Sequence, residues 1–174
     1  MAEPVFGGSL RVVLARRSSS RAVDPSVPEV LAAEQAAGLD DGTGLAGLAD
    51  RAQASAGSLR AYLQEQHAAG RQVLGYGAPS KAAILLGVSE IGRDLLAFTV
   101  DAAELKHGLA VPGVRVPIRP VADLVAARPS VVLILTWDIA DEVVAQLEAA
   151  GGWGAEYVVP LPVPQIYSAA RAEG

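Results

Sequence analysis

A glycine-rich turn between an apolar run and a predicted helix is the segment of this chain best suited to bind an anion. It covers residues 73–81 and reads VLGYGAPSK. Glycine lacks a Cβ, so backbone N–H groups can approach a ligand closely, and a helix N-terminus adds positive partial charge. The turn therefore predicts a phosphate, diphosphate or carboxylate site, although a tight turn without a ligand is the alternative. Its predicted ligand-binding residues are Gly75, Tyr76, Gly77, Ala78, Pro79, Ser80 and Lys81.

The turn matches neither of two standard nucleotide-binding motifs. Ser80 stands where the third glycine of the G-x-G-x-x-G fingerprint would be. The spacing from the glycines to Lys81 is not that of a Walker A loop. The turn thus predicts anion binding in general and no particular nucleotide.

Three residues are candidates for acid–base catalysis: Tyr76, Lys81 and His107. His107 lies in a predicted loop, where a solvated histidine is the simpler interpretation. Asp101 follows a predicted strand, at the position where dinucleotide folds place an acid for a ribose hydroxyl. Capping of the next helix is an equally good interpretation of Asp101.

Composition excludes several classes of protein. The chain has no cysteine and only two histidines, which argues against disulfides, thiolate nucleophiles and a metal site. A net charge of −5 argues against a nucleic-acid partner. The N-terminus does not resemble a signal peptide, and no apolar run approaches the ~18 residues that span a bilayer. We therefore expect a cytoplasmic protein with no membrane partner, bound cofactor or metal.

The elements that must position these residues alternate between strands and helices after residue 70. Apolar strands, most of them followed by helices, predict an α/β fold with a Rossmann-like parallel sheet in the order 3-2-1-4-5, preceded by an N-terminal strand and helical extension. We predict two regions, 1–47 and 48–174. The predicted strands are 10–15, 71–76, 95–100, 113–118, 130–136 and 156–159. The predicted helices are 28–37, 48–69, 80–86, 120–127 and 138–149.

This order predicts a crevice where the connection reverses between the first and fourth strands of the parallel sheet. The glycine turn would face Thr136 and Trp137 across it, and both residues are predicted to bind the ligand. The Trp137 ring could stack on a base or sugar. A packed or cleft-filling side chain is an equally good interpretation of Trp137.

Several short segments spread along the chain together resemble one known family. They are Gly7–Arg11, Gly75–Lys81, Thr99–Asp101, Lys106–Gly108, Pro112–Gly113, Pro117–Ile118 and Leu135–Glu142. With these segments, nearly the whole chain resembles the C-terminal domain of the S-adenosylmethionine-dependent sugar C-methyltransferases. The resemblance implies a Rossmann-like domain that helps to hold a nucleotide-sugar or a related phosphorylated ligand in natural-product biosynthesis.

The sequence also departs from that family's full pattern. The cysteine-rich zinc domain and the glycine-rich cofactor loop have no counterpart before residue 70, and Phe6 replaces the family's histidine. We therefore expect a domain that binds its ligand but does not methylate alone. The alternative is a stand-alone cyclase or isomerase that uses Tyr76, Lys81, Asp101 and His107. The predicted strand 10–15 would need to pair with the Rossmann-like sheet, with a second copy in a homodimer, or with a partner methyltransferase chain.

Overall fold

The computed structural model describes residues 2–3 and 9–167. The predicted motif residues Phe6, Gly7 and Gly8 lie outside this range. The chain divides into two compact units, residues 1–51 and 52–174. The division falls within the second long helix, a few residues after the predicted boundary.

The described elements agree with most of the predicted ones, and their bounds are as follows. The helices are α1 (Ser26–Ala36), α2 (Leu48–Ala68), α3 (Ser80–Val88), α4 (Val121–Ala127) and α5 (Ala140–Ala149), with 3₁₀ turns η1 (Thr43–Leu45), η2 (Glu104–Lys106) and η3 (Trp137–Ile139). The strands are β1 (Ala2–Glu3), β2 (Ser9–Leu10), β3 (Val73–Tyr76), β4 (Thr99–Val100), β5 (Ile118–Arg119), β6 (Val131–Ile134), β7 (Glu156–Val159) and β8 (Gln165–Ile166).

The sheet of the second unit confirms the predicted fold and strand order. Its six strands run in the order β5-β4-β3-β6-β7-β8, which is 3-2-1-4-5 with β8 added at one edge. The first five strands are parallel, whereas β8 pairs antiparallel with β7. At the carboxyl end of β3, Tyr76 lies opposite Val100 on one side and Ile134 on the other. The topological reversal therefore falls between β3 and β6, as predicted.

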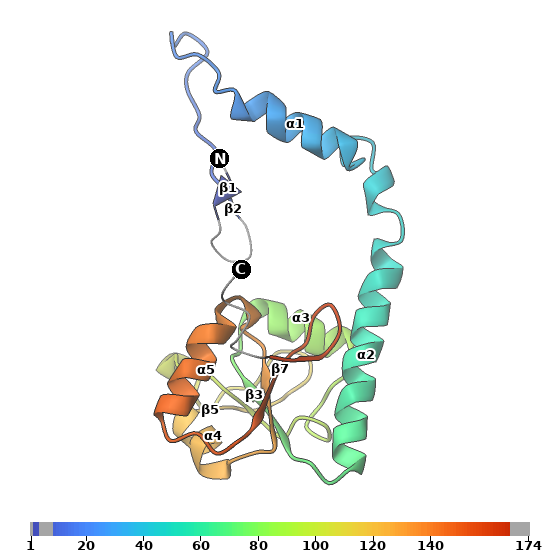
Figure 1. Ribbon diagram of the computed structural model, residues 1–174, viewed down its shortest axis with the longest axis vertical. Helices are drawn as coiled ribbons and strands as arrows, with labels where there is room; N and C mark the ends of the chain where they lie inside the picture. The colour runs from blue at the N-terminus through green and yellow to red at the C-terminus, as the bar shows by residue number, and fades with distance from the viewer. Residues whose placement is uncertain (1, 4–8, 168–174) are drawn as a thin grey trace. The chain divides into compact units, whose positions relative to one another are not determined.

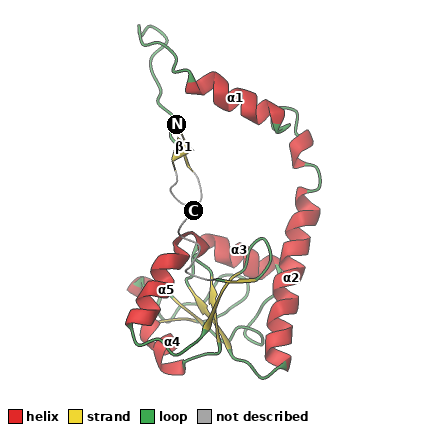
Figure 2. Cartoon of the chain, in the orientation of Figure 1, coloured by secondary structure: helices red, strands yellow, loops and turns green. Residues whose placement is uncertain are grey.

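Helices cover both faces of this sheet, and each face has its own apolar cluster (Figures 1 and 2). One cluster joins alternate strand residues such as Val73 and Leu133 to α2 and α3. The other joins the intervening residues, such as Leu74 and Val132, to α4 and α5. Because successive side chains of a strand point to opposite faces, a strand covered on both sides must be apolar throughout, and β3 and β6 are buried at every position.

The strands predicted over residues 95–100 and 113–118 are shorter in the structure, where they correspond to β4 and β5. The segment before β4 is a turn in which the N–H groups of Leu95 and Leu96 donate to the Gly92 carbonyl. The segment before β5 contains Gly113 and Arg115 at positive φ, and it also turns. Local turn geometry thus overrides the apolar pattern, and only the last residues of each segment join the sheet.

The prediction of a strand over residues 10–15 is wrong except at Leu10. Strand β2 pairs antiparallel with β1, and residues 11–16 have no regular structure. Among the described residues, the six-stranded sheet contains no strand of the first unit. β-prone residues alone do not form a strand without a sheet edge to complete their hydrogen bonds.

The first unit has little core of its own. No residue in the range 10–51 is buried, and α1 contains no buried side chain. Its exposed large apolar residues include Val12, Val13, Leu14 and Leu31, of which Leu14 is 88% exposed. Such an apolar surface is typical of a segment that another protein surface covers.

None of the helices in the described ranges is both long enough and apolar enough to cross a bilayer.

Candidate functional site

A cleft of about 220 Å³ lies at the predicted reversal point, where β3 and β6 end. The end of β3, the loop after β4, the loop after β6 and one face of α5 surround it. Its described lining residues are Tyr76, Gly77, Asp101, Ala102, Thr136, Ile139, Glu142, Val143 and Gln146. Ligands of open α/β sheets bind at this place, outside the carboxyl ends of the strands.

Gly77 brings the turn after β3 against the loop after β6. It has a φ of +95°, and a Cβ added there would lie 2.5 Å from Thr136 Cγ2. The Gly77 N–H donates to the Val100 carbonyl at 2.6 Å, and its own carbonyl accepts from Thr99 Oγ1 at 2.8 Å. Only glycine satisfies both the backbone conformation and this close approach.

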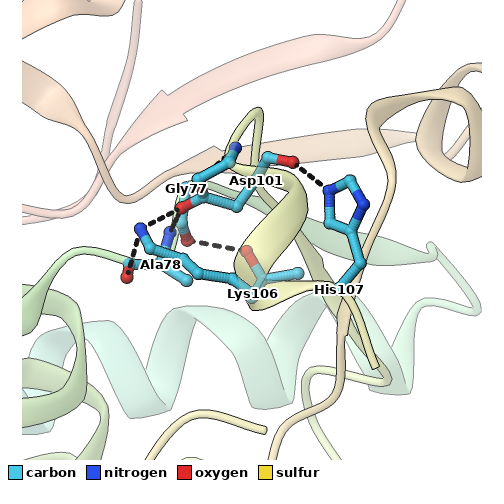
Figure 3. Close-up of polar contacts among 7 residues, drawn as sticks. Gly77, Ala78, Asp101, Lys106 and His107 are labelled. Carbon is cyan, nitrogen blue, oxygen red and sulfur yellow. Dashed lines mark hydrogen bonds and ion pairs between the residues drawn. The ribbon is translucent and has the colours of Figure 1, made fainter. Parts of the chain in front are cut away.

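The Asp101 carboxylate occupies the anion position beside the glycine turn (Figure 3). Its Oδ2 accepts from the Ala78 N–H and from Lys106 Nζ, each at 2.8 Å, and its Oδ1 accepts from the Ala103 N–H at 2.9 Å. Lys106 Nζ also donates to the Ala78 carbonyl at 3.2 Å. One backbone donor of the predicted anion site is thus used by the chain's own carboxylate.

These contacts determine the charge of the two groups that face the cleft from β3 and β4. Burial would raise the pKa of Asp101, but hydrogen bonds from Lys106, Ala103 and Ala78 outweigh it and hold that pKa below its usual value of 3.8. Burial, and then the Asp101 charge, raises the pKa of Tyr76 above 10. At neutral pH Asp101 is ionised, and the protonated Tyr76 hydroxyl donates to Gln146 Oε1 at 2.7 Å.

Lys81 belongs to a separate cluster with the segment after β6. Its ammonium lies 4.1 Å from the centroid of the Trp137 ring and forms an ion pair with Asp138. Its side chain is 35% exposed, so water and other partners can reach it. The predicted meeting of the turn with Trp137 therefore occurs, but outside the lining of the cleft.

The structure brings four of the predicted ligand-binding residues to the cleft: Tyr76, Gly77, Asp101 and Thr136. Gly75 packs instead against Thr99, where an added Cβ would lie 2.6 Å from Thr99 Oγ1. The remaining predicted residues are not part of the cleft lining: Ala78, Pro79, Ser80, Lys81 and Trp137.

The three catalytic candidates do not converge on one point. Tyr76 lines the cleft, whereas Lys81 pairs with Asp138. His107 Nε2 lies 2.8 Å from the Asp101 carbonyl oxygen, on the loop that follows β4. Their catalytic roles and the cyclase or isomerase alternative remain predictions.

Sequence reasoning missed the contribution of α5 and of its preceding turn. Ile139, Glu142, Val143 and Gln146 line the cleft at spacings of three, four and seven residues. This spacing places the four residues on one face of a helix, and it could have been recognised in the sequence. Lys106, which bridges Asp101 and Ala78, was also missed, although its proximity to His107 in sequence was evident.

The described residues contain no group of three or more His, Asp or Glu side chains arranged to hold a metal ion.

Two comparisons with known proteins bear on this site. A family model described as the C-methyltransferase C-terminal domain matches residues 4–162. The C-methyltransferase NovU of Streptomyces niveus is 32% identical over 165 residues, which is 95% of this chain and 39% of the length of NovU. The chain therefore spans about two fifths of this relative, and the match includes every residue that lines the cleft.

Proposed function

The chain belongs to the family of C-methyltransferase C-terminal domains, and we propose that it binds a nucleotide-sugar at the cleft between β3 and β6. The cleft at this topological reversal is the observation that carries the proposal. Beside it, the N-terminus of α3 and the Lys81 ammonium supply positive charge for phosphate groups. The similarity to NovU, a C-methyltransferase, supports a role in handling a methyl-acceptor substrate.

In this proposal the 174 residues hold the substrate and do not transfer a methyl group by themselves. Their sequence contains no counterpart of the family's glycine-rich cofactor loop before residue 70. The methyl donor would be held by another part of the enzyme, in the same or a partner chain.

Replacing Lys81 with alanine tests the phosphate contact. A hydrogen bond between charged groups contributes about 1.5–3 kcal/mol, so we expect Lys81→Ala to weaken binding of thymidine diphosphate glucose by at least about tenfold. Isothermal titration calorimetry measures the dissociation constant. Wild-type protein at a ligand concentration 100 times that constant should gain about 2.7 kcal/mol of stability, which a thermal shift detects.

Arg93→Ala is the matched control for the loss of one cation. Arg93 is exposed and lies before β4, at the opposite end of the strands from the cleft. Its substitution should leave the dissociation constant unchanged. No thermal shift of the wild type with thymidine diphosphate glucose would contradict the proposal, and equal affinity in Lys81→Ala would remove Lys81 from it.

We also propose that the exposed apolar residues of the first unit contact the methyl-transfer part of a C-methyltransferase. The matched segment is 39% of NovU, so most of such an enzyme lies outside it. Val12, Leu14 and Leu31 are more than half exposed and would be covered by this contact. Burial of apolar surface then supplies the association energy.

A double substitution, Leu14→Glu with Leu31→Glu, should abolish this association. The partner in the test is NovU lacking the segment that matches this chain, and sedimentation velocity measures the complex. Leu105→Glu is the matched control, because Leu105 is 94% exposed but lies in the second unit. Association of the double variant as strong as that of wild type would contradict the proposal, and so would a dimer of this chain that excludes the partner.

A further inference from the structure

The charged residues that line the cleft are acidic. Asp101 and Glu142 contribute carboxylates, and among the described lining residues none is a lysine, arginine or histidine. Tyr76, Thr136 and Gln146 contribute neutral polar groups. Lys106 offsets the charge of Asp101, but a phosphate placed here would still be repelled by Glu142, which has no cation partner among the described residues.

The hydrogen-bonding capacity that remains in the cleft favours a ligand rich in donors. Glu142 has no partner in the described structure, so both carboxylate oxygens are available. Tyr76 can still accept through its hydroxyl oxygen, and the Gln146 amide NH₂ can still donate, since only its Oε1 is used. Asp101 already accepts three hydrogen bonds and has little capacity left.

Thr136 adds a group that lacks a partner within the protein. Its Oγ1 is buried and makes no hydrogen bond in the described structure. Buried hydroxyls are usually satisfied, so an unsatisfied one in a cleft lining indicates a site completed by a ligand or by water. A hydroxyl group both donates and accepts, and it would match Thr136 and Glu142 together.

We propose that the cleft takes a neutral, hydroxyl-bearing ring of the ligand, while the phosphates remain outside it, near Lys81 and the start of α3. This inference rests on the proposed nucleotide-sugar binding and adds the orientation of the ligand. Lys106 pairs with Asp101, and the remaining lining groups (Tyr76, Thr136, Glu142 and Gln146) offer both donors and acceptors, which hydroxyl groups of a neutral ring can match. The ring could be the sugar or the pentose of the nucleoside, which have the same hydroxyl chemistry.

An NMR titration of the full chain distinguishes the parts of the ligand. The probes are thymidine diphosphate glucose, thymidine diphosphate, glucose 1-phosphate and inorganic pyrophosphate. The reporters are the Gln146 side-chain amide and the Gly77 N–H in the cleft, and the Ser80 and Lys81 N–H groups outside it. We expect thymidine diphosphate glucose to change the chemical shifts of both sets of reporters, and pyrophosphate to change only those of Ser80 and Lys81. If glucose 1-phosphate changes the chemical shifts of the cleft reporters, the ring in the cleft is the sugar. If thymidine diphosphate changes them, the ring is the pentose of the nucleoside.

Glu142→Gln tests the same inference by affinity. It removes the charge and one acceptor oxygen, so we expect about tenfold weaker binding of thymidine diphosphate glucose and unchanged binding of pyrophosphate. Glu65→Gln is the matched control, because Glu65 is an exposed residue of α2 outside the cleft lining, and this variant should bind as wild type does.

Three results would overturn the inference. Pyrophosphate could shift the cleft reporters, Glu142→Gln could bind the nucleotide-sugar as wild type does, or only Ser80 and Lys81 could respond to that probe. The first two results leave the proposed function standing, whereas the third leaves nucleotide-sugar binding standing but removes it from the cleft. A complete lack of response to thymidine diphosphate glucose overturns the proposed function as well.

Discussion

Gly77→Ala is expected to lower the free energy of unfolding by about 3 kcal/mol, because two independent penalties add at this position. The alanine must adopt a φ near +95°, which disfavours any residue with a Cβ. Its methyl group would also lie 2.5 Å from Thr136 Cγ2, so one of the two chain segments must shift. Because Gly77 and Thr136 both line the cleft, this shift should also weaken ligand binding.

Chemical denaturation of wild type and variant measures the difference, and Gly87→Ala is the control. Gly87 lies within α3, and an added Cβ there meets nothing within 4 Å. This substitution should therefore stabilise the protein by about 0.5–1 kcal/mol, since alanine favours helix more than glycine does. Equal stability of Gly77→Ala and wild type would contradict the close approach of the two segments.

Asp101→Ala is expected to destabilise the protein by about 2–3 kcal/mol. The substitution leaves the Ala78 and Ala103 N–H groups and the Lys106 ammonium without their shared acceptor. The loss of stability is limited because the Lys106 side chain is 39% exposed, so water can solvate its ammonium group. Asp123→Ala is the control, because Asp123 forms only an exposed 3.9 Å pair with Arg119, and it should cost less than about 0.5 kcal/mol.

The pH dependence of stability provides a second measurement on the same carboxylate. The pKa of Asp101 is lowered on folding, so its charge stabilises the native state above its usual pKa of 3.8. This contribution is lost as the pH falls through the still lower pKa of the folded state. The stability difference between wild type and Asp101→Asn should therefore be largest at neutral pH and shrink below about pH 4. A difference that stays constant from pH 7 to pH 3 would be inconsistent with an ionised, hydrogen-bonded Asp101.

The architecture of the second unit could be predicted from local sequence patterns. Strands β3 and β6 are covered on both faces and are therefore apolar throughout. A helix between two strands of one sheet indicates that the strands are parallel, and such crossover connections are right-handed. These two facts leave few strand orders, and the order 3-2-1-4-5, which is the observed one, places Tyr76 near Thr136. The lengths of β4 and β5 could not be predicted as well, because the turns at Gly92 and Gly113 compete with the sheet for the same residues.

The composition of the site was predicted only in part. Residue type and position identified Tyr76, Gly77, Asp101 and Thr136, because each follows a predicted strand at the edge where ligands bind. Sequence alone placed positive charge and Trp137 in the crevice as well. In the structure Lys81 instead contacts Trp137 and Asp138 outside the cleft lining. These contacts depend on how α3 and η3 pack against each other.

Local sequence patterns were thus sufficient to predict the fold of the second unit, the position of the cleft and the residues that follow its strands. Three features appear only in the folded chain: Asp101 accepts from the glycine turn, α5 contributes Glu142 and Gln146, and Thr136 Oγ1 has no partner among the described residues. The difference lies in the sequence separation of the residues involved. Apolar periodicity is a local property, whereas a hydrogen bond between residues 23 or 70 positions apart depends on the exact packing of elements that no short pattern encodes.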